Sequence, residues 1–102
     1  NMWNDDAALL GNGWYWLPWF GYYNANFSPW LFHMQHGWLY AVQGAGEDSV
    51  YFYDLDLGWL FTSATLYPSL YSFDLQTWLF YQEGSSDPRN FVDLQTGVWY
   101  QY

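Results

Sequence analysis

Tryptophan recurs along this chain at nearly regular intervals, and each recurrence opens a short aromatic run. The spacings are 24, 21, 19 and 21 residues, between Trp14, Trp38, Trp59, Trp78 and Trp99. A period of about twenty residues is typical of stacked supersecondary units, each of which can bury its apolar face only against a neighbour. The spacing therefore predicts an array of similar small units.

The stretch from Val50 to Phe61 indicates what one unit is. Side chains alternate between two faces along residues 50–53, and no helical period is present. Aromatic and β-branched residues favour strands, and the residues from Asp54 to Gly58 supply the side-chain oxygens and the permissive backbone that a reversal needs. Residues 59–61 then return, with Trp59 and Phe61 on one face. The stretch is predicted to be an antiparallel hairpin.

Similar strands and turns can be placed along the rest of the chain. Pro18 divides the aromatic run 14–23 into two short strands, because proline cannot donate to a sheet. Residues 5–10 fit either one helical turn or a leading strand. Further strands are expected at 30–33, 38–42, 70–74 and 91–94, and connections at 24–29, 43–49, 62–68 and 82–90. The predicted fold class is all-β, an array of short antiparallel hairpins in a single domain of residues 1–102.

Charge narrows the range of partners. The formal net charge is −9, and Arg89 is the one Lys or Arg of the chain. Such a chain lacks the cations that neutralise phosphates, which argues against nucleic acid and against anionic membrane surfaces. No apolar run reaches the length of a membrane-spanning helix, so membrane insertion is not expected. Cysteine is absent, which excludes disulfides.

The two histidines, His33 and His36, are three residues apart. Zinc needs a third and a fourth ligand, and no other residue is spaced to supply them. A turn could bring the two rings together, but the prediction is that they are turn residues that pack on neighbouring tryptophan rings.

Acidic residues gather at turns, as Asp54 and Asp56 and as the adjacent pairs 5–6 and 47–48. Calcium accepts such oxygens but requires six to eight of them, and the Asp-rich loop signature with its distal Glu is absent. These carboxylates are instead expected to cap backbone amides and to keep an aromatic protein soluble. No metal and no cofactor is therefore predicted.

Catalysis is not expected either. A glycosidase places two carboxylates beside an aromatic cleft, and burial raises the pKa of one of them. Here the acids fall in turns while the aromatic residues fill the strands, so no acid is expected to be buried in an apolar run. No nucleophile elbow, phosphate-binding loop or metalloprotease motif is present. The chain is predicted not to be an enzyme.

Aromatic residues are the main candidates for function. Both faces of the 50–61 hairpin are apolar, so one face needs a second layer, another copy or a ligand to cover it. About half of the rings are expected to form the core. The candidates for an aromatic interface or a sugar-stacking surface are Trp14, Trp16, Trp19, Trp30, Trp38, Tyr40, Tyr51, Tyr53, Trp59, Phe61, Trp78, Phe80 and Trp99.

Several runs carry a resemblance to a known module. They are Gly13-Trp14-Tyr15-Trp16-Leu17-Pro18-Trp19-Phe20-Gly21, Pro29-Trp30-Leu31-Phe32-His33, His36-Gly37-Trp38-Leu39-Tyr40, Leu57-Gly58-Trp59-Leu60-Phe61-Thr62-Ser63 and Tyr67-Pro68-Ser69-Leu70-Tyr71. In order and spacing, residues 11–102 resemble an aromatic-rich module at the C-termini of large secreted proteins of environmental bacteria. That resemblance implies secretion and β structure.

A looser similarity is to glucan-binding and choline-binding cell-wall repeats, which also place Gly-Trp before an aromatic strand about every twenty residues. This chain lacks their lysines and their regular glycine spacing, so their choline-cage residues are not carried over.

Two functions follow as expectations. The first is a non-catalytic structural protein that self-associates as a homo-oligomer or polymer, such as a filament or a surface-layer subunit. The alternative is a carbohydrate-binding module that stacks polysaccharide on Trp and Tyr. Because the chain begins at Asn1 rather than Met, we expect a processed chain or a fragment. An extracellular or cell-surface location suits its aromatic, lysine-free composition.

Overall fold

A computed structural model describes residues 2–102, and the strands account for all of its regular secondary structure. They are β1 (Ala8–Gly11), β2 (Trp14–Leu17), β3 (Gly21–Asn24), β4 (Trp30–His33), β5 (Gly37–Gln43), β6 (Ser49–Asp54), β7 (Gly58–Ser63), β8 (Ser69–Ser72), β9 (Thr77–Tyr81), β10 (Asn90–Asp93) and β11 (Trp99–Gln101). The all-β prediction is confirmed. The described residues contain no helix long and apolar enough to cross a membrane.

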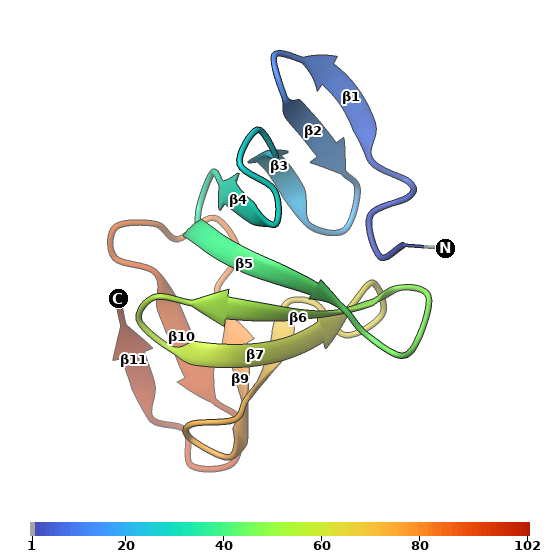
Figure 1. Cartoon of the computed structure of the whole chain (residues 1–102). Coiled ribbons are helices and arrows are strands. Elements are labelled where there is room, and N and C mark those ends of the chain that lie inside the picture. Colours follow the sequence, from blue (N-terminus) through green and yellow to red (C-terminus); the bar gives the residue numbers. More distant parts are fainter. Residues whose placement is uncertain (1) are drawn as a thin grey trace.

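All eleven strands belong to one sheet, in which each strand is antiparallel to the next one along the chain. Figure 1 shows β1 to β4 at one end, the longer β5 to β7 across the middle, and β9 to β11 at the opposite end. Because spatial order follows chain order, β1 and β11 are the two edges of the sheet. The structure is thus an open array of hairpins, as the tryptophan spacing predicts.

The turns that close four of the hairpins share one construction. The last residue of the first strand turns a side-chain acceptor back onto backbone N–H groups two or three residues later. Asp54 Oδ1 accepts from the backbone N of Asp56 at 2.9 Å and of Leu57 at 3.1 Å. The same role falls to His33 Nδ1, Ser72 Oγ and Asp93 Oδ1. This arrangement confirms that Asp54 caps turn amides.

Four residues after each acceptor, the backbone adopts a positive φ. The values are 74° at Gly37, 76° at Gly58, 54° at Gln76 and 75° at Gly97. Glycine enters this left-handed region at little cost, whereas other residues are strained there. The acceptor and the left-handed residue together fix the tight reversal, and the tryptophan of the repeat follows within one or two residues.

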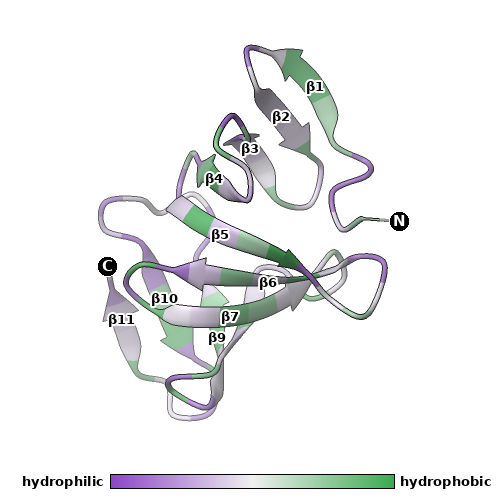
Figure 2. Cartoon of the chain, in the orientation of Figure 1, coloured by the Kyte–Doolittle hydropathy of each residue, from purple (hydrophilic) through white to green (hydrophobic). Residues whose placement is uncertain are grey.

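The sheet coils so that one face encloses the core. Buried apolar side chains form two clusters, one of Trp3, Leu17, Phe20, Tyr23, Leu31, Leu39, Val50 and Phe52, the other of Leu57, Leu60, Leu70, Leu79, Tyr81 and Phe91. Figure 2 shows strongly hydrophilic residues mainly in the turns and connections. Because the sheet coils, its own strands cover one apolar face of the hairpins, and this cover does not come from a second layer.

Some boundaries differ from the prediction. Residues 62 and 63, predicted as part of a connection, extend β7, because they pair with Val50 and Ser49 of β6. The N-terminal segment contains turns and then β1, so the strand alternative holds there and the helical one does not. Pro18 lies in the turn between β2 and β3, which confirms its predicted role.

Candidate functional site

The tryptophans of the repeat lie on the outer face of the sheet. Trp38, Trp59 and Trp78 are 40%, 40% and 37% exposed, whereas the leucine after each of them is at most 2% exposed. Successive residues of a strand point to opposite faces, so the leucine enters the core and the tryptophan remains outside. The outer face of the central strands is consequently aromatic.

Outer rings meet in cross-strand pairs with a common geometry. The ring centroids of Phe32 and Trp38 are 5.3 Å apart, those of Tyr53 and Trp59 5.4 Å, and those of Tyr71 and Trp78 5.4 Å, with interplanar angles of 66–71°. Edge-to-face pairs of this kind stabilise a fold by about 0.5–1.5 kcal/mol beyond their burial. The two rings of each pair therefore pack edge to face and are not coplanar.

None of the thirteen predicted surface rings belongs to the buried core. Seven are exposed, namely Trp16, Trp38, Tyr53, Trp59, Trp78, Phe80 and Trp99, and six are half-buried, namely Trp14, Trp19, Trp30, Tyr40, Tyr51 and Phe61. They do not all share one surface. Trp19 packs on Trp3 and Tyr67 beside the core, and Trp14 lines an apolar groove with Leu10.

Further exposed rings were not among the predicted positions: Tyr22, Phe27, Phe32, Phe73 and Tyr102. For Phe32 the sequence holds a signal, since Phe32 lies two residues after Trp30 on the same face of β4. It also pairs directly with Trp38 of β5.

Two grooves of about 360 Å³ open on the surface. One lies between Trp78 and Tyr71 and the turn residues Gln76 and Gln95, and no charged side chain lines it. The other brings together the acid pairs 5–6 and 47–48 beside Trp19. Among residues 2–102, no three His, Asp or Glu side chains are arranged to hold a metal ion.

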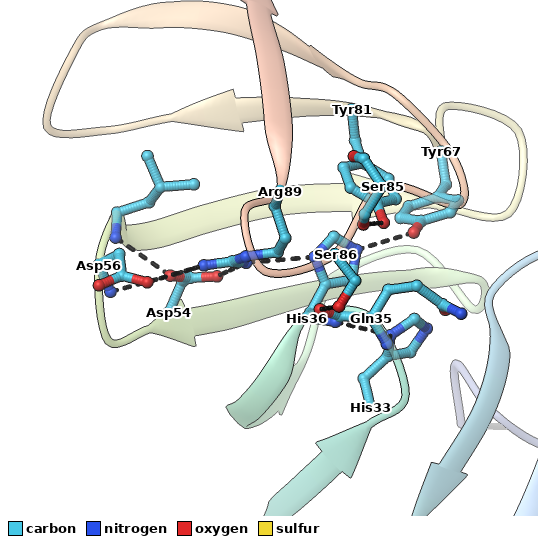
Figure 3. Close-up of polar contacts among 11 residues, drawn as sticks. His33, Gln35, His36, Asp54, Asp56, Tyr67, Tyr81, Ser85, Ser86 and Arg89 are labelled. Atoms are coloured by element: carbon cyan, nitrogen blue, oxygen red, sulfur yellow. Dashed lines mark hydrogen bonds and ion pairs between the residues drawn. The ribbon is translucent and has the colours of Figure 1, made fainter. Parts of the chain in front are cut away.

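A polar network lies inside the coil, centred on Arg89 (Figure 3). This residue is 4% exposed and comes from the connection between β9 and β10. Its Nη2 lies 3.1 Å from Asp54 Oδ1 and 3.0 Å from Asp56 Oδ2, and its Nη1 pairs with the other oxygen of Asp54. Arg89 Nη1 also donates to His36 Nδ1 at 3.2 Å. One guanidinium thus joins β6, the β4–β5 turn and the β9–β10 connection.

Hydrogen bonds fix both histidines in the neutral form. Since the arginine can only donate, His36 Nδ1 accepts and the ring proton lies on Nε2, 2.8 Å from the hydroxyl of Tyr67. His33 Nδ1 accepts two backbone N–H groups, so its Nε2 donates to the carbonyl of Phe20 at 2.7 Å. Burial lowers the pKa of His33 to about 4.

The pKa of His36 is well below its ordinary value, first because of burial and then because of the adjacent His33 ring and the Arg89 charge. Burial also raises the pKa of Tyr67. Throughout residues 2–102, every buried side-chain nitrogen or oxygen has a hydrogen-bond partner. The network is therefore fully satisfied, with the Arg89–Asp54 pair as its buried charges.

Two expectations about polar residues are wrong. Asp54 is 1% and Asp93 6% exposed, although no acid was expected to be buried among apolar strands. The histidine rings pack on Phe20 and Tyr81, each at 4.3 Å, and not on tryptophan. The reason is the same in each case: the coil directs the acceptor position of the turn inward, away from the outer tryptophans.

No family model, curated protein or solved structure matches this chain. The resemblance to the secreted aromatic module therefore remains a prediction, and function has to be argued from the surfaces just described.

Proposed function

We propose that this protein is a non-catalytic structural subunit that self-associates through the outer aromatic face of its sheet, outside the cell, as a filament or surface layer. The observation that carries the proposal is the exposure of that face. Trp16, Trp38, Trp59, Trp78 and Trp99 are 37–56% exposed, although the core is complete without them.

Two physical arguments support association with further copies. Large contiguous apolar patches on soluble proteins typically mark interaction surfaces, and Trp and Tyr are enriched in the interfaces that cover them. Rings braced edge to face, such as Tyr53 and Trp59 at 66°, present an uneven surface. That relief suits interdigitating side chains of another copy better than the flat face of a sugar ring.

The experiment is the size of the native species in dilute neutral buffer, by sedimentation with negative-stain imaging. We expect assemblies larger than the 12.2 kDa chain. Replacing both Trp38 and Trp59 by Ser should weaken association at least about tenfold, because interface tryptophans commonly contribute 2 kcal/mol or more. The matched control replaces Leu55 and Leu66, which are 64% and 37% exposed on turns, by Ser and should leave association unchanged. A monomer at all concentrations would contradict the proposal.

Carbohydrate binding is the second candidate, and one observation favours it. The uncharged groove combines the Trp78 and Tyr71 rings with the side-chain amides of Gln76 and Gln95, for which residues 2–102 provide no hydrogen-bond partner. Rings and free amides are the groups that recognise a neutral sugar. A monomer that a glycan array retains, and that loses retention in Trp78→Ala, would favour this function over self-association.

A further inference from the structure

The last strand leaves part of its backbone unpaired. β11 contacts β10 alone within the sheet, and its residues Trp99 and Gln101 are exposed. An edge strand with free N–H and C=O groups is a template for a strand from another chain, unless charge, proline or a bulge protects it. β11 contains no charged residue and no proline, and no bulge interrupts its pairing with β10.

The pattern of hydrogen bonds shows which backbone groups face the free edge. Arg89 and Tyr102 exchange both backbone bonds, at 2.7 and 3.0 Å, and Asp93 N donates to Val98 O at 2.8 Å. Bonded and non-bonded pairs alternate in an antiparallel ladder. The register therefore makes Tyr100 a bonded partner of β10. The N–H and C=O groups of Trp99 and Gln101 consequently point away from β10.

This arrangement is complementary to itself. When two β11 strands lie antiparallel with Tyr100 at the centre, Trp99 of each copy lies opposite Gln101 of the other. Both positions present an outward N–H and an outward C=O, so all the outward groups of the two strands find partners. If the register shifted by one residue, Gln101 of one copy would lie opposite Tyr100 of the other. The backbone groups of Tyr100 point toward its own β10, so they could not bond Gln101.

Strand number favours this contact over a head-to-tail one. Eleven successive antiparallel strands leave β1 and β11 running in the same direction. If β1 of another copy joined β11 with the outer faces on the same side, the new pair would be parallel. A two-fold axis normal to the sheet keeps the pairing antiparallel and the outer faces together. In addition, the pairing of β1 with β2 is irregular between Leu9 and Gly11.

Charge and side-chain order point the same way. The net charge is −9, yet residues 94–102 contain no charged side chain, so two copies meet through a segment without acidic side chains. On the outer face, Gln101 donates to Asn90 and Asn90 donates to Gln82, both at 2.9 Å. This amide row holds the Gln101 side chain in place at the edge before a partner arrives, which lowers the entropic cost of association.

We propose that β11 pairs with β11 of a second copy about a two-fold axis, which continues the antiparallel sheet and the outer aromatic face across the contact. This inference rests on the proposed self-association and adds a second contact, at the edge of the sheet, to the one made by the outer aromatic face.

Proline at position 101 tests the contact in the intact chain. Because the Gln101 N–H faces the free edge, Gln101→Pro removes no backbone bond to β10. It loses the side-chain bond to Asn90 and removes an intermolecular backbone donor from each copy. We expect association to weaken about 30-fold, as measured by sedimentation. The matched control, Gln101→Ser, also loses the side-chain amide but keeps the N–H, so it should associate much more strongly than Gln101→Pro. If Gln101→Pro associates as the native chain does, the β11 contact is wrong and the proposed function stands, whereas a monomeric native chain overturns both.

Disulfide capture tests the register, since the chain contains no cysteine. Residue 100 of each copy would face its mate across a non-bonded pair with Cα atoms about 4.5 Å apart, within the range that a disulfide spans. Tyr100→Cys should therefore cross-link to a dimer on mild oxidation. Gln101→Cys, diagonal to its mate at about 7–8 Å, should cross-link far less. Equal or reversed cross-linking would overturn the proposed register.

Discussion

Arg89 connects parts of the chain that lie far apart in sequence. Its partners Asp54 and His36 precede it by 35 and 53 residues. Two buried charges are retained here because each is paired and hydrogen-bonded, and removing one partner from such a pair typically costs about 3–5 kcal/mol. A single side chain thereby holds the β9–β10 connection against the middle of the sheet.

The neutral histidines make stability depend on pH. An unfolded histidine binds a proton near pH 6.5, whereas the pKa of His33 in the fold is about 4 and that of His36 is also lowered. Between these limits the unfolded state binds more protons, so stability rises with pH. We expect the free energy of unfolding to be nearly constant from about pH 7.5 to pH 9, between the range in which histidine titrates and the range in which tyrosine titrates. Below about pH 6.5, that energy should fall by up to about 1.4 kcal/mol per pH unit for each histidine, and the contribution of His33 should level off near pH 4.

Urea unfolding of dilute protein, followed by tryptophan fluorescence at several pH values, measures this slope. His33→Asn is the matched variant, because its side-chain oxygen can accept the backbone N–H groups as Asp54 does in the next turn. In the variant, the slope of the unfolding free energy against pH should be smaller by the contribution of one histidine, up to about 1.4 kcal/mol per pH unit. A slope that stays the same in the variant would show that His33 does not titrate as described.

At the scale of the element, the hairpin turns repeat one construction with different residues. His33, Asp54, Ser72 and Asp93 are the acceptors, and a residue with positive φ follows four positions later each time. Backbone geometry and one acceptor are sufficient for the reversal, so the acceptor type varies. The variation places His33 and Asp54 in the buried network, while the turns themselves remain alike.

Gly37 and Gly58 form a matched pair for testing these turns. Their φ values are nearly equal, but a Cβ at Gly58 would lie 2.5 Å from Asp74 Oδ2, whereas a Cβ at Gly37 would meet nothing within 4 Å. Gly37→Ala should therefore cost only the left-handed strain of about 1–2 kcal/mol. Gly58→Ala should cost slightly more, because the exposed Asp74 carboxylate must turn away. Urea unfolding gives both values. In a Gly58→Ala/Asp74→Ala double variant, the excess should disappear, and persistence of the excess would refute the clash.

For the whole molecule, the proposed assembly has to overcome electrostatic repulsion. Copies with a net charge of −9 repel one another, while exposed rings and an uncharged edge strand attract them. Salt shortens the range of the repulsion between exposed charges, from about 30 Å at 0.01 M to about 3 Å at 1 M. Apolar and backbone contacts have no such long-range dependence.

We therefore expect self-association to be stronger at 0.5 M than at 0.01 M NaCl, as measured by sedimentation at constant pH. Circular dichroism at both salt concentrations provides the control that the fold is unchanged. Association that weakens as salt is added would contradict an apolar contact between like-charged copies, because it would indicate attraction between opposite charges.

Local patterns in the sequence determined the hairpins. Period-two alternation, tryptophan spacing and turn residues such as Asp54 and Gly58 act over a few residues, so strands and reversals follow from them directly. The same patterns located the candidate rings, and none of the thirteen is in the buried core. They could not say which face of a hairpin lies inside, because both faces are apolar.

The tertiary structure decided which face is inside and which polar groups are buried. Coiling of the sheet sends the leucines after Trp38, Trp59 and Trp78 inward, and it brings Arg89 to Asp54 and His36. The contacts of Arg89 join residues that are separated by 35 and by 53 positions, and such contacts leave no periodic signal in a single sequence. Whether Arg89 reaches Asp54 depends on how far the sheet coils. The extent of coiling is a property of all eleven strands together, and no single repeat determines it.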